Sequence, residues 1–171
     1  TRQRKLSLKP TEICKLIDHS LGAVLVPDNV TISSSHSANE PWIEVDSDQI
    51  VQVLTNLIIN AVEAMPDGGN IKVSTEDDHD RVYIKVEDKG TGIPEDVLKK
   101  IFEPLFTTKQ IGKGTGLGLA VTYGIVKMHG GKIDVITNAD ITKGPTGTTF
   151  KVSLPRKRPA TATDDVFGSE K

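Results

Sequence analysis

The sequence has little cysteine, no long apolar run and no excess of either charge, and each absence excludes a class of protein. Cys14 is the only cysteine among 171 residues, so an internal disulfide cannot form and a reducing compartment is expected. No apolar stretch approaches the roughly 20 residues that a membrane-spanning helix needs, and no secretory signal is visible. A net charge of −2 shows no basic bias, so nucleic acid is not an expected partner.

Length and composition suit one domain. A chain in which 36% of the residues are hydrophobic and 26% charged can build a soluble core of its own. It begins with Thr1 rather than Met, so we expect a piece of a longer protein, with any membrane or sensor segment outside it. We expect residues 1–9 to form a short strand or a linker, residues 10–155 to form the domain, and residues 156–171, which offer little to bury, to form a disordered tail.

Apolar periodicity predicts a mixed α/β fold. Helical spacing predicts three main helices at 11–24, 48–65 and 115–128, with Thr11 capping the first and Asp46 or Ser47 the second. Strands are expected at 29–34, 41–45, 132–137 and 148–153 and in a hairpin around the loop Glu76–Asp80, with a short helix at 95–101. Because no regular βαβ series appears, we predict a two-layer α/β sandwich with a mixed sheet of about five strands and the main helices on one face.

Two asparagines lie within the second predicted helix. Asn56 and Asn60 are four residues apart, so their side chains share one helix face. A solvated helix face would also explain them. However, asparagine favours caps and turns over helix interiors, and here apolar residues separate the pair. A side-chain carbonyl oxygen at this place is a suitable ligand for Mg²⁺, which takes oxygen ligands and shares them with phosphates.

A glycine-rich loop follows the strand that ends near Asp88. Gly90 and Gly92 allow the backbone to approach a flat ligand closely. A carboxylate accepts hydrogen bonds but cannot donate them, so Asp88 would favour the amino group of adenine over the carbonyl of guanine. An ordinary Asp/Gly turn is the alternative for this segment taken alone.

A second glycine-rich segment, Gly112 to Gly118, leads directly into the third main helix. Free amides at a helix N-terminus favour phosphate, and Lys113 adds a positive charge. A flexible loop is the alternative. The Walker pattern GxxxxGK[ST] fails, because Thr107 occupies the place of its first glycine and Gly114 that of its Ser/Thr. The dinucleotide pattern GxGxxG fails in every register of residues 112–121.

The order of these motifs resembles the catalytic domain of sensor histidine kinases, which has the Bergerat ATP-binding fold. Asp48–Ala61 is similar to the N box of that family, and Asp88–Pro94 and Gly112–Ala120 to its two glycine boxes. Ile101–Lys109 is similar to the F box and Gly147–Phe150 to the last motif. Phe-Glu-Pro-x-Phe-Thr-Thr-Lys and Tyr-Gly-Ile-Val-Lys-x-His-Gly-Gly most resemble the nitrogen-regulatory sensor kinases.

The resemblance implies ATP and Mg²⁺ as ligands and assigns roles to matching residues. Asn56, Asn60 and Lys109 are the implied catalytic residues, and Asn60 is the implied Mg²⁺ ligand. Residues 103–114 are implied to form a lid over ATP, and Asp88 to bind the adenine amino group. The full implied ATP-binding set is Asn56, Asn60, Glu63, Ala64, Asp88, Gly90, Gly92, Ile93, Phe102, Thr107, Thr108, Lys109, Gly112, Lys113, Gly114, Thr115, Gly116, Leu117, Gly118 and Thr148.

Two positions bear on the reaction. Many histidine kinases carry Lys where this chain has Glu63, so the role of Glu63 is open. Related ATPases carry a general-base Glu where this chain has Asn56, whose amide cannot take up a proton at neutral pH. The resemblance therefore implies phosphoryl transfer to an external histidine, with an autonomous ATPase and a nucleotide-switched protein-binding module as alternatives.

The implied partners are a histidine-bearing dimerisation domain of the same kinase and a response regulator. His19, His36, His79 and His129 lack the surroundings of the family's acceptor histidine, and a cation at a helix C-terminus accounts for His129. We therefore expect no self-phosphorylation by this chain. We also expect a monomer in the cytoplasm, without membrane contact of its own.

Overall fold

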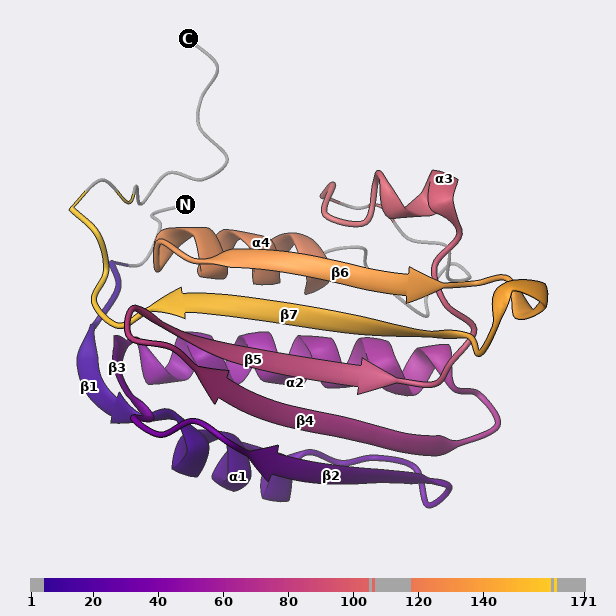
Figure 1. The fold of residues 1–171 in the computed structure, drawn as a ribbon, viewed down its shortest axis with the longest axis horizontal. Helices are drawn as coiled ribbons and strands as arrows, with labels where there is room; N and C mark the ends of the chain where they lie inside the picture. Colours follow the sequence, from indigo (N-terminus) through magenta and orange to yellow (C-terminus); the bar gives the residue numbers. More distant parts are fainter. Residues whose placement is uncertain (1–4, 105, 107–117, 161, 163–171) are drawn as a thin grey trace, which may run out of the picture.

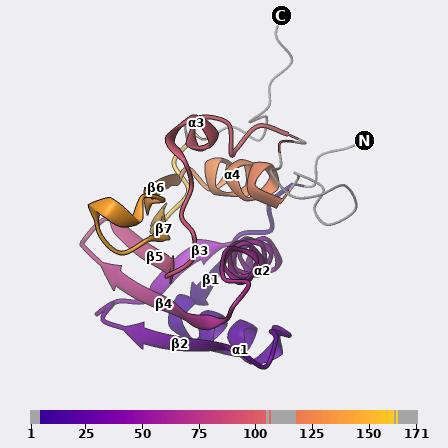
Figure 2. The same cartoon turned by 90° about the vertical axis from the view of Figure 1, so that its right-hand side faces the viewer.

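The computed structural model describes residues 5–104, 106, 118–160 and 162. It contains a five-stranded mixed sheet in the order β2-β4-β5-β7-β6, a two-stranded sheet β1-β3, and helices α1, α2 and α4 on one face of the larger sheet (Figures 1 and 2). The elements are β1 (Lys9–Glu12), α1 (Ile13–Ala23), β2 (Val30–His36), β3 (Trp42–Val45), α2 (Ser47–Ala64), β4 (Gly69–Asp77), β5 (Arg81–Asp88), α3 (Glu95–Leu98), α4 (Gly118–Met128), β6 (Lys132–Asn138), the 3-10 helix η1 (Ile141–Lys143) and β7 (Gly147–Pro155). The predicted two-layer α/β sandwich is confirmed.

The register of the central strands decides which side chains meet at the edge of the sheet. β2 pairs with β4 in parallel, and the other pairs of the larger sheet are antiparallel. Asp88 at the end of β5 is opposite Thr148 of β7, and Thr148 is in turn opposite Thr137 of β6. Three polar residues from segments far apart in the sequence are therefore neighbours at one end of the sheet.

The core lies between the sheet and α2. The strands alternate between buried and exposed residues, as a sheet with one solvated face requires. The buried side chains of α2 are Ile50, Val53, Leu54, Leu57, Ile58 and Ala61. Burial of each such side chain contributes about 1.5–3 kcal/mol, so this apolar stripe fixes the rotation of α2. The opposite stripe, with Asn56 and Asn60, is thereby turned away from the sheet.

The N-terminal region differs from the prediction in two ways. The first helix begins at Ile13, and its cap is Glu12 rather than Thr11: the Glu12 carboxylate accepts from the backbone N–H groups of Cys14 and Lys15. A strand, β1, precedes it and pairs with β3. The predicted linker boundary at residue 9 therefore falls inside a paired strand, because Pro10 is tolerated in a strand at the edge of a sheet. The second helix is capped by Asp46, one of the two predicted residues.

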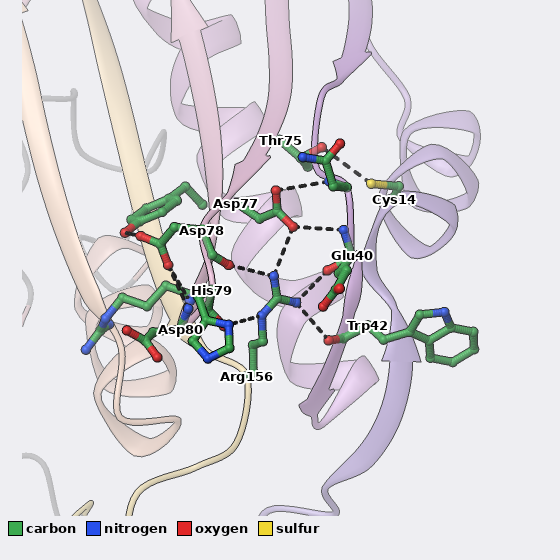
Figure 3. Close-up of polar contacts among 12 residues, drawn as sticks. Cys14, Glu40, Trp42, Thr75, Asp77, Asp78, His79, Asp80 and Arg156 are labelled. Atoms are coloured by element: carbon green, nitrogen blue, oxygen red, sulfur yellow. Dashed lines mark hydrogen bonds and ion pairs between the residues drawn. The ribbon is translucent and has the colours of Figure 1, made fainter.

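The folded part of the chain also continues past the predicted boundary at residue 155. The Arg156 guanidinium donates to the Asp77 carboxylate at 2.9 Å and to backbone carbonyls of four residues (Figure 3). These acceptors are Glu40, Trp42, Asp78 and His79. Arg156 joins the β4–β5 turn to the segment that leads into β3. Residues 156–160 are therefore not a disordered tail, because a five-donor side chain finds partners on both segments.

The explanation offered for His129 was wrong. This side chain is 2% exposed, and burial lowers the pKa of its imidazole. Its Nδ1–H donates to the carbonyl of Ile125 at 2.8 Å, and its Nε2 accepts from the backbone N–H of Asp46 at 3.1 Å. These two partners require the neutral ring, so His129 is a connection between the C-terminus of α4 and the N-terminus of α2 rather than a helix-end cation.

The segment before β1 also contacts Asp46. The backbone N–H of Ser7 donates to the Asp46 carboxylate at 2.9 Å, so one residue caps α2, receives the segment before β1 and faces the buried imidazole. None of the described helices is long and apolar enough to cross a membrane.

Candidate nucleotide-binding site

A cavity of about 220 Å³ opens at the end of the sheet where β5 and β7 place Asp88 and Thr148. The C-terminal half of α2 forms one wall, and the loop after β5 and the region of α3 form the others. The described lining residues are Asn60, Glu63, Ala64, Asp88, Thr91, Gly92, Ile93, Val97, Ile101, Phe106, Leu119 and Thr148. One wall is apolar and another carries a few polar groups, as is typical of a site for a flat heterocycle.

Asp88 is the most buried ionisable group of this cavity. It is 4% exposed, and its burial raises the pKa of the carboxyl, against the lowering effect of the backbone N–H groups of Gly90 and Thr148. The Gly90 N–H lies 2.9 Å from Oδ1. An ionised carboxylate here offers only lone pairs to a ligand. The arrangement therefore selects a ligand edge that carries an N–H donor.

The loop after Asp88 needs glycine at both positions. A Cβ at Gly90 would collide with the carbonyl oxygen of Ala64 in α2, and one at Gly92 with the carbonyl oxygen of Asn138. Gly92 also has φ +76°, where other residues are strained. Because Thr91 N–H donates to the same Ala64 carbonyl at 3.1 Å, the loop is held against the end of α2. The structure thus requires both glycines for contacts with the protein's own backbone, whereas the sequence prediction concerned the approach of a flat ligand.

Asn60 and Glu63 line the cavity from α2. In the part of the chain that the structure describes, the Asn60 side chain makes no hydrogen bond. Its amide oxygen therefore suits a hard cation held jointly with phosphate oxygens. No group of three or more His, Cys, Asp or Glu residues within the described ranges is arranged to hold a metal ion.

Asn56 has a different environment from the predicted one. Its Nδ2 donates to the carbonyl of Gly118 at 3.2 Å and to the hydroxyl of Thr122 at 3.3 Å. It is not among the described lining residues. Asn56 therefore joins α2 to the first turn of α4. Asn60, one helical turn further along the same face of α2, lines the cavity instead.

The apolar wall was partly misassigned from the sequence. Phe102 was predicted to contact the ligand, but it is not among the described lining residues, and its ring packs on Tyr123 with centroids 5.4 Å apart. Ile101 and Phe106 line the cavity in its place. Sequence reasoning also missed Thr91, Val97 and Leu119. The spacing of Val97 and Ile101, four residues apart, was the available signal.

The remaining predicted residues divide into two groups. Asn60, Glu63, Ala64, Asp88, Gly92, Ile93 and Thr148 line one cavity, while Gly90 approaches the lining residue Ala64 and the Gly118 carbonyl accepts from Asn56. The other predictions lie outside the described residues; they are Thr107, Thr108, Lys109, Gly112, Lys113, Gly114, Thr115, Gly116 and Leu117.

The sandwich and its cavity define an α/β domain of the purine-nucleotide-binding class. Residues 45–158 match the family described as histidine kinase-, DNA gyrase B- and HSP90-like ATPase, and the chain belongs to this family. The sensor kinase CckA of Brucella abortus (strain 2308) is 42% identical over 173 residues, which cover 90% of this chain and 18% of that protein. The sensor histidine kinase ZraS of Escherichia coli (strain K12) is 42% identical over 158 residues, which cover 90% of this chain and 33% of ZraS.

Solved structures show the same fold. The catalytic domain of the histidine kinase ThkA has a TM-score of 0.74 and 30% identity, and the match covers 89% of this chain and 97% of that one. Full-length ShkA in complex with AMPPNP has a TM-score of 0.77 and 26% identity, covering 95% of this chain and 34% of ShkA. ThkA in complex with the response regulator TrrA has a TM-score of 0.69 and 27% identity, and the match covers 90% of this chain and 43% of that one. The chain thus corresponds to one domain of these longer kinases.

Proposed function

We propose that this chain is the ATP-binding catalytic domain of a sensor histidine kinase, which binds Mg-ATP and transfers the γ-phosphoryl group to a histidine on a separate upstream domain. The observation that carries the proposal is the convergence of Asn60, Asp88 and Thr148 on one cavity, although 28 and 60 residues separate them in sequence. The match to kinase catalytic domains along their whole length supports the same role.

The cavity can recognise adenine with groups of this chain alone. Asp88 accepts from the amino group, and the loop held against Ala64 lets the heterocycle lie close to the backbone. Ile93, Val97 and Ile101 cover the face of the ring. A guanine carbonyl in the same place would meet a carboxylate that cannot donate to it.

Asn60 would hold Mg²⁺ at the phosphate side of the site. A Mg²⁺ held there would supply positive charge to offset the negative charge that builds up on the phosphates during transfer. Asn60 lines the cavity, and so does Glu63, which lies three residues further along the same helix. We propose that these α2 residues orient the phosphates, and that Lys109 in the predicted lid adds positive charge to them.

A kinase fits the site better than an ATPase. Water attack needs a general base within hydrogen-bond reach, and Asn56 occupies the place where related ATPases carry a glutamate. Its Nδ2 donates to the Gly118 carbonyl and to Thr122, so its amide is occupied in helix packing. An acceptor imidazole supplies its own lone pair, and positioning and charge neutralisation then suffice.

We propose two partners on the basis of the assignment as a kinase catalytic domain. One is the histidine-bearing dimerisation domain, which would precede this chain, and the other is a response regulator, as in the complex of ThkA with TrrA. We propose a cytoplasmic monomer for the chain by itself. We also propose membership of the nitrogen-regulatory subclass, on the motifs around Phe102 and Tyr123; similarity to CckA and ZraS leaves this finer assignment as a proposal.

Labelled ATP tests the proposal directly. The chain is incubated with [γ-³²P]ATP, with and without a separately made acceptor domain. Acid-labile label should appear on the acceptor alone and disappear with Asn60→Ala. Label on the chain itself would contradict the absence of an acceptor, and multiple turnover without any acceptor would favour the ATPase. Nucleotide binding without transfer in the presence of the acceptor would favour the switched binding module.

A further inference from the structure

We propose that Thr137 is a positioning residue for purine selection: it holds the hydroxyl proton of Thr148 away from the cavity, so that Thr148 meets the purine only as a hydrogen-bond acceptor. The inference rests on the proposed adenine site at Asp88. Thr137 belongs to β6, was not singled out from the sequence, and is not among the described residues that line the cavity.

Thr137 lies one layer behind the cavity and makes three hydrogen bonds there. Its hydroxyl oxygen is 2.9 Å from the backbone nitrogen of Ile93, 3.0 Å from the carbonyl oxygen of Gly147 and 2.8 Å from the hydroxyl oxygen of Thr148. Ile93 and Thr148 line the cavity themselves. One side chain therefore holds two parts of the proposed purine site, the loop after β5 and the strand β7.

The direction of these bonds follows from counting protons. A hydroxyl has one proton to donate and two lone pairs with which to accept. The Gly147 carbonyl can only accept, so it takes the Thr137 proton; the Ile93 N–H can only donate, so it occupies one lone pair. The remaining lone pair then accepts the proton of Thr148. This is the arrangement in which all three distances are hydrogen bonds at once.

The Thr148 oxygen consequently offers lone pairs toward the cavity. Thr148 is 4% exposed, so bulk water does not compete for its proton. Its partner across the strands is Asp88, whose carboxylate also only accepts. Two acceptors side by side favour a purine with an amino group at C6 and oppose one with a carbonyl there. Selection for adenine thus depends on a β6 residue that the purine does not touch.

The test compares ATP with ITP, which carries a carbonyl at C6 and a proton on N1 where ATP has an amino group and an unprotonated N1. Dissociation constants of the whole chain are measured by displacement of a fluorescent ATP analogue. In Thr137→Val the proton of Thr148 is free to donate to the carbonyl, and the preference for ATP over ITP should fall about three- to tenfold, the worth of one hydrogen bond. Thr137→Ser keeps the hydroxyl, so its preference should stay within about twofold of the unmodified chain.

The ratio separates this role from a merely structural one. If Thr137 only stiffened the loop at Ile93, Thr137→Val would weaken both nucleotides equally and leave the ratio unchanged, which would overturn the proposal. Thr148→Val supplies the second arm: adding Thr137→Val to it should no longer move the ratio. A change of the same size in that background would also overturn it.

One measurement needs no variant and no nucleotide. By NMR, the hydroxyl proton of Thr148 should exchange slowly with water and show a cross-peak to the side chain of Thr137. Fast exchange without such a cross-peak would refute the proton arrangement even if Thr137→Val failed to fold. Failure of the unmodified chain to bind ATP would instead refute the proposed function, so the two failures are distinguishable.

Discussion

The two ends of the five-stranded sheet use their polar residues in opposite ways. At the end of the sheet where β4 and β7 finish (Figure 1), Arg156, Asp77, Asp46 and His129 each have two or more hydrogen bonds. At the other end, Asn60 and Asp88 face a cavity. We call the first the anchored end and the second the nucleotide end. The anchored end stabilises the fold, while the nucleotide end keeps polar groups available for a ligand.

Two aspartates illustrate the difference. The backbone N–H groups of Asn39 and Glu40, followed by the Arg156 guanidinium, lower the pKa of Asp77. Burial raises the pKa of Asp88. Ionisation of Asp77 therefore stabilises the fold at neutral pH, and ionisation of Asp88 opposes it. A residue whose ionisation destabilises the fold is expected at a position where ligand binding, rather than folding, decides the residue type.

The largest effect on folding is expected at the anchored end from Arg156→Ala. Loss of this guanidinium leaves the Asp77 carboxylate and four carbonyls without their donor, which should lower the free energy of unfolding by about 2–4 kcal/mol. Urea denaturation measures the loss. ATP affinity should change less than about threefold once folded protein is compared, because the site lies at the other end of β5.

Lys157→Ala is the matched control, since Lys157 is the exposed neighbour of Arg156. Its effect should stay within about 0.5 kcal/mol. A strong loss of ATP affinity in folded Arg156→Ala, with stability unchanged, would reverse the assignment of the two ends.

At the nucleotide end, Asp88→Asn is expected to weaken ATP binding, whereas Arg156→Ala weakens folding. The amide keeps the shape but turns an acceptor into a partial donor, so ATP affinity should fall by about 1.5–3 kcal/mol, roughly 10- to 100-fold. Calorimetric titration measures this fall. Glu87→Gln, on the exposed neighbour of Asp88, should bind ATP as the unmodified chain does.

The same variant also has a predicted pH signature. Since the folded-state pKa of Asp88 is raised above 3.8, its contribution to stability is lost as pH rises from about 3.8 through that higher value. Asp88→Asn lacks this titration, so its melting temperature relative to the unmodified chain should increase across that window. A difference in melting temperature that does not vary with pH would show that burial does not raise the pKa of Asp88.

His129→Gln should have a smaller effect at the anchored end. The substitution removes the neutral ring that accepts from Asp46 N–H, and we expect a loss of about 1–2 kcal/mol. Burial places the folded-state pKa of His129 below 6.5, so the unmodified chain should lose stability as pH falls from about 6.5 toward that lower value. Thermal unfolding between pH 5 and 8 checks both points.

Thr122→Val is the smallest predicted change and lies between the two ends. Thr122 is fully buried and its hydroxyl accepts from Asn56 while donating to the Gly118 carbonyl. Its loss should lower the free energy of unfolding by about 1 kcal/mol. Denaturant unfolding measures it, and no change would mean that Asn56 finds another partner on α4.

The fold was largely predictable, because it depends on local periodicity. The stripe of Ile50, Leu54 and Leu57 and the alternation of Ile71 and Val73 predict α2 and β4 whatever surrounds them. A strand at 41–45 was predicted, but its pairing with Lys9–Glu12 was missed, since a single sequence does not show which segments pair.

The site was predictable where one residue type permits one chemistry. Gly90 and Gly92 were singled out for the approach of a flat ligand, and the structure adds that a Cβ at either position would collide with the backbone of Ala64 or Asn138. Phe102 was predicted at the ligand, but its ring packs on Tyr123 of α4, a contact that a single sequence does not show. Arg156, His129 and Thr137 act through partners more than 30 residues away, and a single sequence does not show which partners those are.

Titration of Mg-ATP into the unmodified chain by calorimetry tests the central claim most directly, beside Asn60→Ala, Asp88→Ala and a GTP control. The account predicts saturable ATP binding that both substitutions greatly weaken, and no comparable binding of GTP. Absence of ATP binding, or binding that survives both substitutions, would contradict the claim that the nucleotide end keeps its polar residues for ATP.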